Sequence, residues 1–119
     1  MPPLTMYLIV DIEQLISEWR GAVSAFAGAK ANTEYLREFR KSKKAILIGQ
    51  AEREGLKTGQ ERESYAYAHK EYTDLLEALK IAIEQSEELR WRMTIAQERV
   101  NIWRTKQANG RKEQNNYGA

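Results

Sequence analysis

The longest regular pattern in the chain is an apolar seam that advances in alternating steps of three and four residues. Its members are Tyr72, Leu75, Leu79, Ala82, Ser86, Leu89, Met93, Ala96, Val100 and Trp103. This spacing is the a/d repeat of a left-handed coiled coil, sustained for roughly four and a half heptads. A helix of that length measures about 45 Å, which exceeds the width of a small globular domain. The pattern therefore predicts a long C-terminal helix that packs along another helix, in the same chain or in a neighbouring one.

The second half of this helix carries an additional apolar row, formed by Trp91, Ile95 and Ile102. The row is offset from the seam, so apolar side chains are expected on two sides of the helix. A helix with two apolar faces needs two partners, and a short chain has few helices to supply both. We therefore expect self-association through Trp91, Ile95, Ile102 and Trp103. The alternative is that Trp91 lies beneath a terminal loop.

The N-terminal part of the chain is predicted to be an arm followed by a helix. Residues 1–10 contain two prolines and an apolar run, which indicates an extended arm or a short strand. Asp11 followed by Gln14 resembles a capping box. Apolar residues then recur at helical spacing, namely Ile12, Leu15, Ile16, Trp19, Val23 and Phe26. This helix either ends near Gly28 or continues through the small residues around it.

A second helix is predicted from Asn32. It carries Tyr35, Phe39, Ser42 and Ile46 on one side, flanked by Leu36 and Leu47. It should end before Gly55, which suits the left-handed C-cap position. Thr58 and Glu61 form a capping box that restarts the helix, and a kink is expected within residues 68–70. The long helix should then run to about Lys106.

These elements predict an all-α fold, an antiparallel helical hairpin or bundle with a long C-terminal helix of coiled-coil type. The predicted organisation is an arm over residues 1–10, a helical domain over residues 11–107 and a flexible tail over residues 108–119. The tail prediction rests on its Asn, Gly, Gln and Lys content. An oligomer is expected, because 119 residues allow only a modest core.

Composition narrows the class of protein. The chain has no cysteine, which excludes disulfides and thiolate chemistry and fits a reducing cytoplasm. Its longest uncharged apolar run, Met6 to Val10, is too short to span a bilayer, so we expect no membrane association.

Catalysis has little support in the sequence. His69 is the single histidine and has no cysteine partner, so a surface or capping role is expected for it. Glu87 and Glu88 are adjacent, so they point in different directions on a helix and cannot form a catalytic pair of carboxylates without a partner from elsewhere. The Gly55 to Gly59 segment lacks the Gly-Lys-Ser/Thr ending of a phosphate-binding loop. We therefore expect no enzyme, no catalytic residue, no metal site and no cofactor.

Basic residues outnumber acidic ones between Lys30 and Arg62, and again from Arg90 to Lys112 near the C-terminus, although the net charge of the chain is only +2. The second helix carries Arg37, Arg40, Lys41 and Lys44 on one side, and Arg53, Lys57 and Arg62 surround the break. Such segments are either phosphate-facing surfaces or solvated helix faces. Tyr65 and Tyr67 follow the break, and single-stranded nucleic acid is held by this mixture of cations and aromatic rings. The alternative is that Tyr65 or Tyr67 packs in the core while Arg62 pairs with a neighbouring glutamate.

The order of the predicted elements also resembles that of a known protein family. The basic helix has the pattern Tyr35-Leu-x-x-Phe39-x-Lys41-x-x-Lys44-Ala45, and it is followed by Ala51-Glu, a lysine-containing break, Arg62-x-x-Tyr65 and a closing amphipathic helix. Over roughly Tyr35 to Trp103 the chain resembles the UvsY-type recombination mediators of tailed phages. The stretch from Glu98 to Ala108 also resembles an ending that recurs in small phage-encoded helical proteins.

The resemblance implies an all-helical, ring-like oligomer that binds single-stranded DNA. It further implies a protein that helps load a recombinase onto strands coated by a single-strand-binding protein, in the cytoplasm of a bacterial host. Family members bind DNA through a segment rich in Lys, Arg and Tyr at the break, and by match Arg62 and Tyr65 carry over. The alternative function is a phage assembly or chaperone-like coiled coil that binds protein and not DNA.

Overall fold

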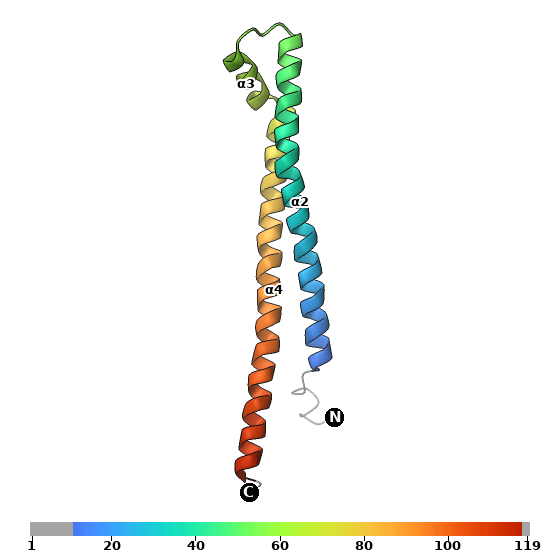
Figure 1. Cartoon of the computed structure of the whole chain (residues 1–119), viewed down its shortest axis with the longest axis vertical. Coiled ribbons are helices and arrows are strands. Elements are labelled where there is room, and N and C mark those ends of the chain that lie inside the picture. The colour runs from blue at the N-terminus through green and yellow to red at the C-terminus, as the bar shows by residue number, and fades with distance from the viewer. Residues whose placement is uncertain (1–10, 118–119) are drawn as a thin grey trace, which may run out of the picture. The chain divides into compact units, whose positions relative to one another are not determined.

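The computed structural model describes residues 11–117, which form three α-helices (Figure 1). Helix α2 spans Ile12–Arg53, α3 spans Gly59–Ala68 and α4 spans Lys70–Tyr117. No strand occurs within these described residues, so the all-α prediction is confirmed. The arm predicted over residues 1–10 lies outside the described part of the chain.

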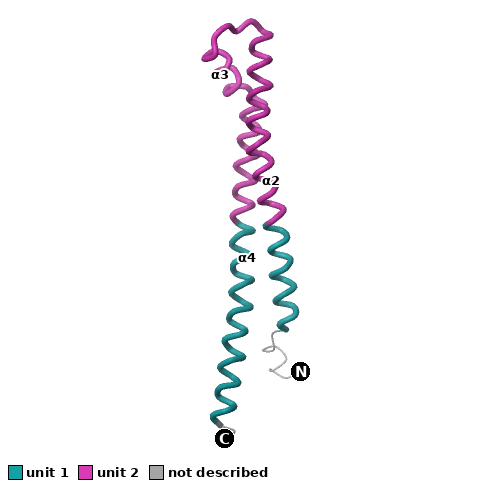
Figure 2. The backbone as a smooth tube through the Cα atoms, in the orientation of Figure 1, with its two compact units in different colours: residues 1–26, 88–119 teal, residues 27–87 magenta. Residues whose placement is uncertain are grey.

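The contacts divide the chain into two units (Figure 2). Unit 1 comprises residues 1–26 and 88–119, and unit 2 comprises residues 27–87, where the sequence had indicated one helical domain over 11–107. In unit 2 the Thr33 hydroxyl donates to the Ala82 carbonyl at 3.2 Å, and Lys43 pairs with Glu71 at 3.2 Å. The partner of the later α2 residue, Lys43, thus comes earlier in α4 than the partner of Thr33. The two helices are therefore antiparallel, as the hairpin prediction requires.

The predicted seam of α4 is the packed side of that helix. All ten of its members are buried or half-buried, and Val100 retains only 1% of its exposed surface. On α2, residues spaced alternately three and four apart are likewise buried or half-buried. They are Ile12, Leu15, Trp19, Ala22, Phe26, Ala29, Thr33 and Leu36. In each unit, α2 and α4 therefore both contribute residues of a heptad seam to the packing.

Helix α2 continues through Gly28, which resolves the choice that the sequence left open. A glycine within a helix costs only about 1 kcal/mol relative to alanine, and alanines at 27, 29 and 31 favour the helix around it. The seam keeps its phase across this position because Phe26, Ala29 and Thr33 are all covered. Packing along α4 thus outweighs the local weakness of Gly28.

The second half of α2 packs through its flanking residues. Leu36 is half-buried and Leu47 is fully buried, whereas Tyr35 is 64% exposed and Ile46 is 55% exposed. The reason is the heptad phase set from Ile12, which turns the Tyr35 side of the helix away from α4.

Helix α4 extends further than the sequence indicated. The prediction of a helix end near Lys106 and a tail from residue 108 is wrong for residues 108–117, which are helical. Residues 104–116 are exposed, so local propensity must maintain the helix there. Arg111, Lys112, Glu113 and Gln114 are good helix formers, and extending an existing helix needs no new nucleation.

The ends of the helices confirm the predicted break. Gly55 has φ of 96°, in the left-handed region. The Gly55 N–H donates to the Glu52 carbonyl and the Leu56 N–H donates to the Ala51 carbonyl, both at 3.1 Å. These two bonds form the Schellman motif that ends helices with glycine in this position.

Side chains cap the N-termini of α3 and α4. The Thr58 hydroxyl accepts from the Glu61 N–H at 3.1 Å, and the Glu61 carboxylate accepts from the Lys57 N–H at 3.3 Å. The kink expected within residues 68–70 is a break at His69, whose ψ is 137°. The His69 Nδ1 accepts from the Glu71 N–H at 3.1 Å, which confirms a capping role for this histidine.

Replacing Gly55 with alanine should lower the free energy of unfolding by about 1–2 kcal/mol, the cost of a left-handed conformation for an L-residue. Nothing lies within 4 Å of a Cβ added at Gly55, so backbone strain alone is tested. Gly59→Ala is the matched control, because this helical glycine also has open space around it. Urea denaturation should show a loss only for Gly55→Ala, and equal effects would contradict the assignment.

Candidate nucleic-acid interface

Helix α3 is held in place by a small cluster in unit 2. Leu47 of α2 and Ala66 of α3 are both 0% exposed, and Tyr72 of α4 is 5% exposed, with Ile48 packed against them. Burying such side chains stabilises by about 1.5–3 kcal/mol for each large one. Figure 1 shows α3 folded back beside the end of α2. The cluster therefore positions the whole segment from Arg53 to Tyr67.

Arg53 and Lys57 lie on either side of the Gly55 turn. Both residues are exposed. Within the described part of the chain neither side chain forms an ion pair, although the Lys57 backbone N–H is bound by Glu61. These two cations are therefore available to an anionic ligand.

Arg62 and Tyr65 instead hold the loop together. The Arg62 Nε donates to the Leu56 carbonyl at 2.8 Å, and the Tyr65 hydroxyl donates to the Glu54 carboxylate at 3.2 Å. Burial raises the pKa of Tyr65 above its usual value, and the Glu54 carboxylate raises it further, so the phenol stays neutral. The two DNA-binding residues that carry over from the resemblance are thus engaged in local contacts, and Arg62 binds a carbonyl where a glutamate had been the alternative.

Tyr67 is a half-exposed residue that also contacts α2 and α4. It is 48% exposed, and its ring packs edge-on against Tyr72 with centroids 5.4 Å apart. The Lys44 ammonium lies 4.6 Å from the Tyr67 ring centroid and 3.7 Å from the Glu63 carboxylate. The neighbouring Tyr67 side chain raises the pKa of Lys44, while burial lowers this pKa and Glu63 raises it further. Lys44 therefore belongs to the contact between α2 and α3.

The remaining cations of the second predicted helix are on the surface of α2. Arg37 pairs with Glu34 at 3.1 Å and Lys41 pairs with Glu38 at 3.2 Å, while Arg40 is half-buried. Exposed ion pairs of this kind contribute only about 0–1 kcal/mol. Arg37 and Lys41 can therefore turn to another anion at little cost.

Sequence reasoning missed the acidic partners of these residues. The spacing of three between Glu34 and Arg37 is a helical pairing that can be read from the sequence. The pair of Glu54 with Tyr65 joins residues on different sides of the break, so it depends on the fold. The interface is consequently less basic than a count of its cations suggests.

The apolar row of α4 is exposed in unit 1. Trp91 is 55% exposed, Ile95 58% and Ile102 51%. The Arg90 guanidinium lies 4.8 Å from the Trp91 ring centroid, and no described loop covers this tryptophan. Trp103, which was grouped with this row, is half-buried and lines a pocket with Leu15 of α2. The row therefore consists of Trp91, Ile95 and Ile102.

Among residues 11–117, no group of three His, Cys, Asp or Glu side chains is arranged to hold a metal ion. None of the described helices combines the length and hydropathy needed to cross a membrane.

Comparisons with known proteins add no constraint to this geometry. A scan against protein-family models, a search of curated proteins and a search of solved structures each found no match to the chain.

Proposed function

We propose that this protein is an oligomeric single-stranded DNA-binding protein that acts as a recombination mediator. The observation that carries the proposal is the pair of exposed cations, Arg53 and Lys57, at a turn that precedes the half-exposed Tyr67 ring. Cations pair with phosphates and aromatic rings stack on bases, so this segment has both elements of sequence-tolerant binding to single strands.

The role in recombination rests on the resemblance to UvsY-type mediators. In that role the protein helps load a recombinase onto DNA coated by a single-strand-binding protein. A single site of this kind is weak, because Glu54, Glu61 and Glu63 lie in the same segment. An oligomer that repeats the site gains affinity because the second and later contacts are intramolecular. The exposed row of Trp91, Ile95 and Ile102 supports such an oligomer.

Replacing Arg53 and Lys57 together with alanine should weaken binding to a fluorescent oligothymidylate about tenfold at low salt. Each phosphate contact contributes about −0.7 to the slope of log affinity against log salt concentration for single strands. Losing two contacts should therefore reduce the magnitude of the slope by about 1.4 per site. Fluorescence anisotropy titrations at several salt concentrations measure both quantities.

Arg20→Ala with Lys30→Ala is the matched control, since it removes two exposed cations of α2 away from the turn. A separate Tyr67→Ala variant should lose a stacking contribution of about 1–3 kcal/mol per base with an unchanged salt slope. If the turn variant and the control bind alike, the turn is not the DNA site, and Arg37 with Lys41 becomes the next candidate.

A second candidate function is supported by the apolar row alone. A phage assembly or chaperone-like protein would use Trp91, Ile95 and Ile102 to bind another protein and would not need DNA. Salt distinguishes the two functions, because a phosphate-driven complex weakens steeply as salt rises and apolar helix pairing does not.

A further inference from the structure

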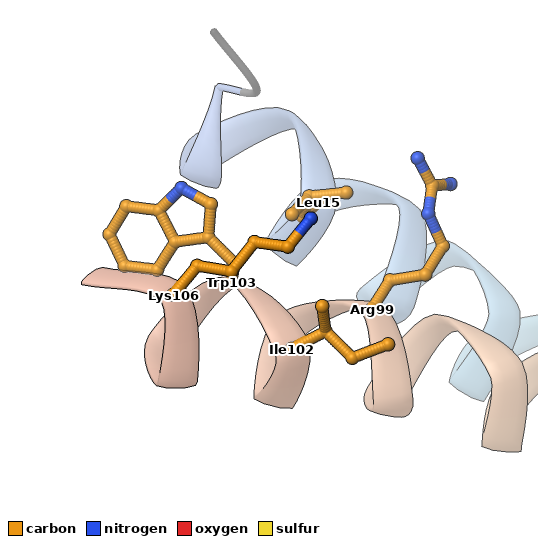
Figure 3. Close-up of a pocket in the computed structure, with 5 residues that line it drawn as sticks. All are labelled: Leu15, Arg99, Ile102, Trp103 and Lys106. Carbon is orange, nitrogen blue, oxygen red and sulfur yellow. The ribbon is translucent and has the colours of Figure 1, made fainter. Parts of the chain in front are cut away.

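Unit 1 contains a pocket between α2 and α4 that the proposed DNA interface does not use. Its cavity volume is about 180 Å³, and it is lined by Leu15, Arg99, Ile102, Trp103 and Lys106. Figure 3 shows the apolar groups of Leu15, Ile102 and Trp103 together, with the long side chains of Arg99 and Lys106 extending toward α2. Sites for drug-sized ligands measure about 300–1,000 Å³. This pocket is smaller and suits one apolar side chain.

Two of the lining residues belong to a basic stripe along α4. Arg92, Arg99 and Lys106 are spaced by seven residues, so they lie along one edge of the helix about 10.5 Å apart. Arg92 pairs with Glu88 at 2.8 Å and Arg99 pairs with Glu18 at 2.7 Å. Lys106 is exposed and forms no ion pair within the described residues. The stripe is therefore positive overall, with its unpaired cation at the pocket.

We infer that the pocket and the stripe bind the C-terminal end of an acidic peptide. The last side chain of the peptide, which is apolar, enters between Leu15, Ile102 and Trp103. The terminal carboxylate accepts hydrogen bonds from the Lys106 ammonium. Preceding carboxylates lie along the stripe toward Arg92, since an extended chain advances about 3.3 Å per residue and about three residues span each interval.

A peptide fits this surface better than a nucleic acid does. Glu18 and Glu88 accompany two of the three cations, so Lys106 is the one cation of the stripe without an ion pair within the described residues, which suits a single carboxylate better than a run of phosphates. Leu15 and Ile102 offer no hydrogen bonds to the edge of a base. The inference concerns a protein partner and uses residues of unit 1, so it is independent of DNA binding at the Gly55 turn, and it shares only Ile102 with the proposed self-association row.

The test is a titration of the full chain with a short fluorescent peptide that contains several aspartates and ends in a free phenylalanine. Lys106→Glu should weaken this binding about tenfold or more, the usual effect of losing a charge-assisted hydrogen bond. Lys106→Gln should give a smaller loss. Arg111→Glu is the matched control, because it makes the same charge change at an exposed position of α4 outside the pocket and should leave affinity within about twofold.

The peptide with an amidated C-terminus should bind about as poorly to the natural chain as the free peptide binds to Lys106→Glu. The inference is overturned if the free peptide does not bind, or if Lys106→Glu and Arg111→Glu weaken binding equally. It is also overturned if Lys106→Glu abolishes binding of an oligothymidylate while peptide binding is unchanged, because the stripe would then be a nucleic-acid site.

Discussion

Replacing Ile95 and Ile102 together with glutamate is expected to convert the proposed oligomer into a monomer whose helix content is nearly unchanged. Three half-exposed apolar side chains, including Trp91, provide on the order of 3 kcal/mol per subunit when a partner covers them. Two buried carboxylates would oppose association by more than this amount. Because both positions are exposed within the chain, the helix itself should tolerate the change.

Sedimentation velocity and circular dichroism at micromolar concentration measure the two parts of this prediction. Gln97→Glu with Asn101→Glu is the matched control, since it adds the same charge at exposed positions of α4 outside the row. The control should remain associated. A natural chain that already sediments as a monomer would show that the apolar row does not mediate self-association.

Replacing Leu47 with alanine should lower the free energy of unfolding by about 2–5 kcal/mol. Leu47 is fully buried where α2, α3 and α4 meet, so its truncation leaves a cavity against Ala66 and Tyr72. Because this cluster positions α3, the variant should also lose the proposed DNA affinity at temperatures where α3 detaches.

The neighbouring residue supplies the control for this prediction. Ile46 is 55% exposed, so Ile46→Ala should change stability by no more than about 0.5 kcal/mol. Urea denaturation of both variants gives the comparison. Similar losses for Leu47→Ala and Ile46→Ala would mean that α3 does not pack on α2 as described.

The fold was largely predictable because its signals are local. The seam from Tyr72 to Trp103 repeats with Ser86 as its one small polar member, and Gly55 and Thr58 mark the break through backbone and capping preferences. The error in the second half of α2 has a specific cause. Ile46 is as apolar as Leu47, and Tyr35 has a large apolar ring, so residue types alone do not say which pair faces α4, and only the phase carried through Gly28 decides it.

The candidate site was less predictable because its contacts join segments that are distant in the sequence. Residue types placed Arg62 and Tyr65 among the DNA-binding groups, yet both are engaged by the loop, through the Leu56 carbonyl and the Glu54 carboxylate. The Lys44 contact with Tyr67 likewise depends on how α3 docks. By contrast, Arg53 and Lys57 form no ion pair within residues 11–117, so their place in the candidate site stays a prediction from residue type.

The central claim is that an oligomer of this hairpin binds single-stranded DNA through phosphate contacts. Light scattering of the natural chain with and without a labelled oligothymidylate, at low and high salt, tests it most directly. We predict an oligomer in both salt conditions and a protein–DNA complex that forms at low salt and dissociates at high salt. An oligomer that never takes up the oligonucleotide would contradict the claim and favour the protein-binding function.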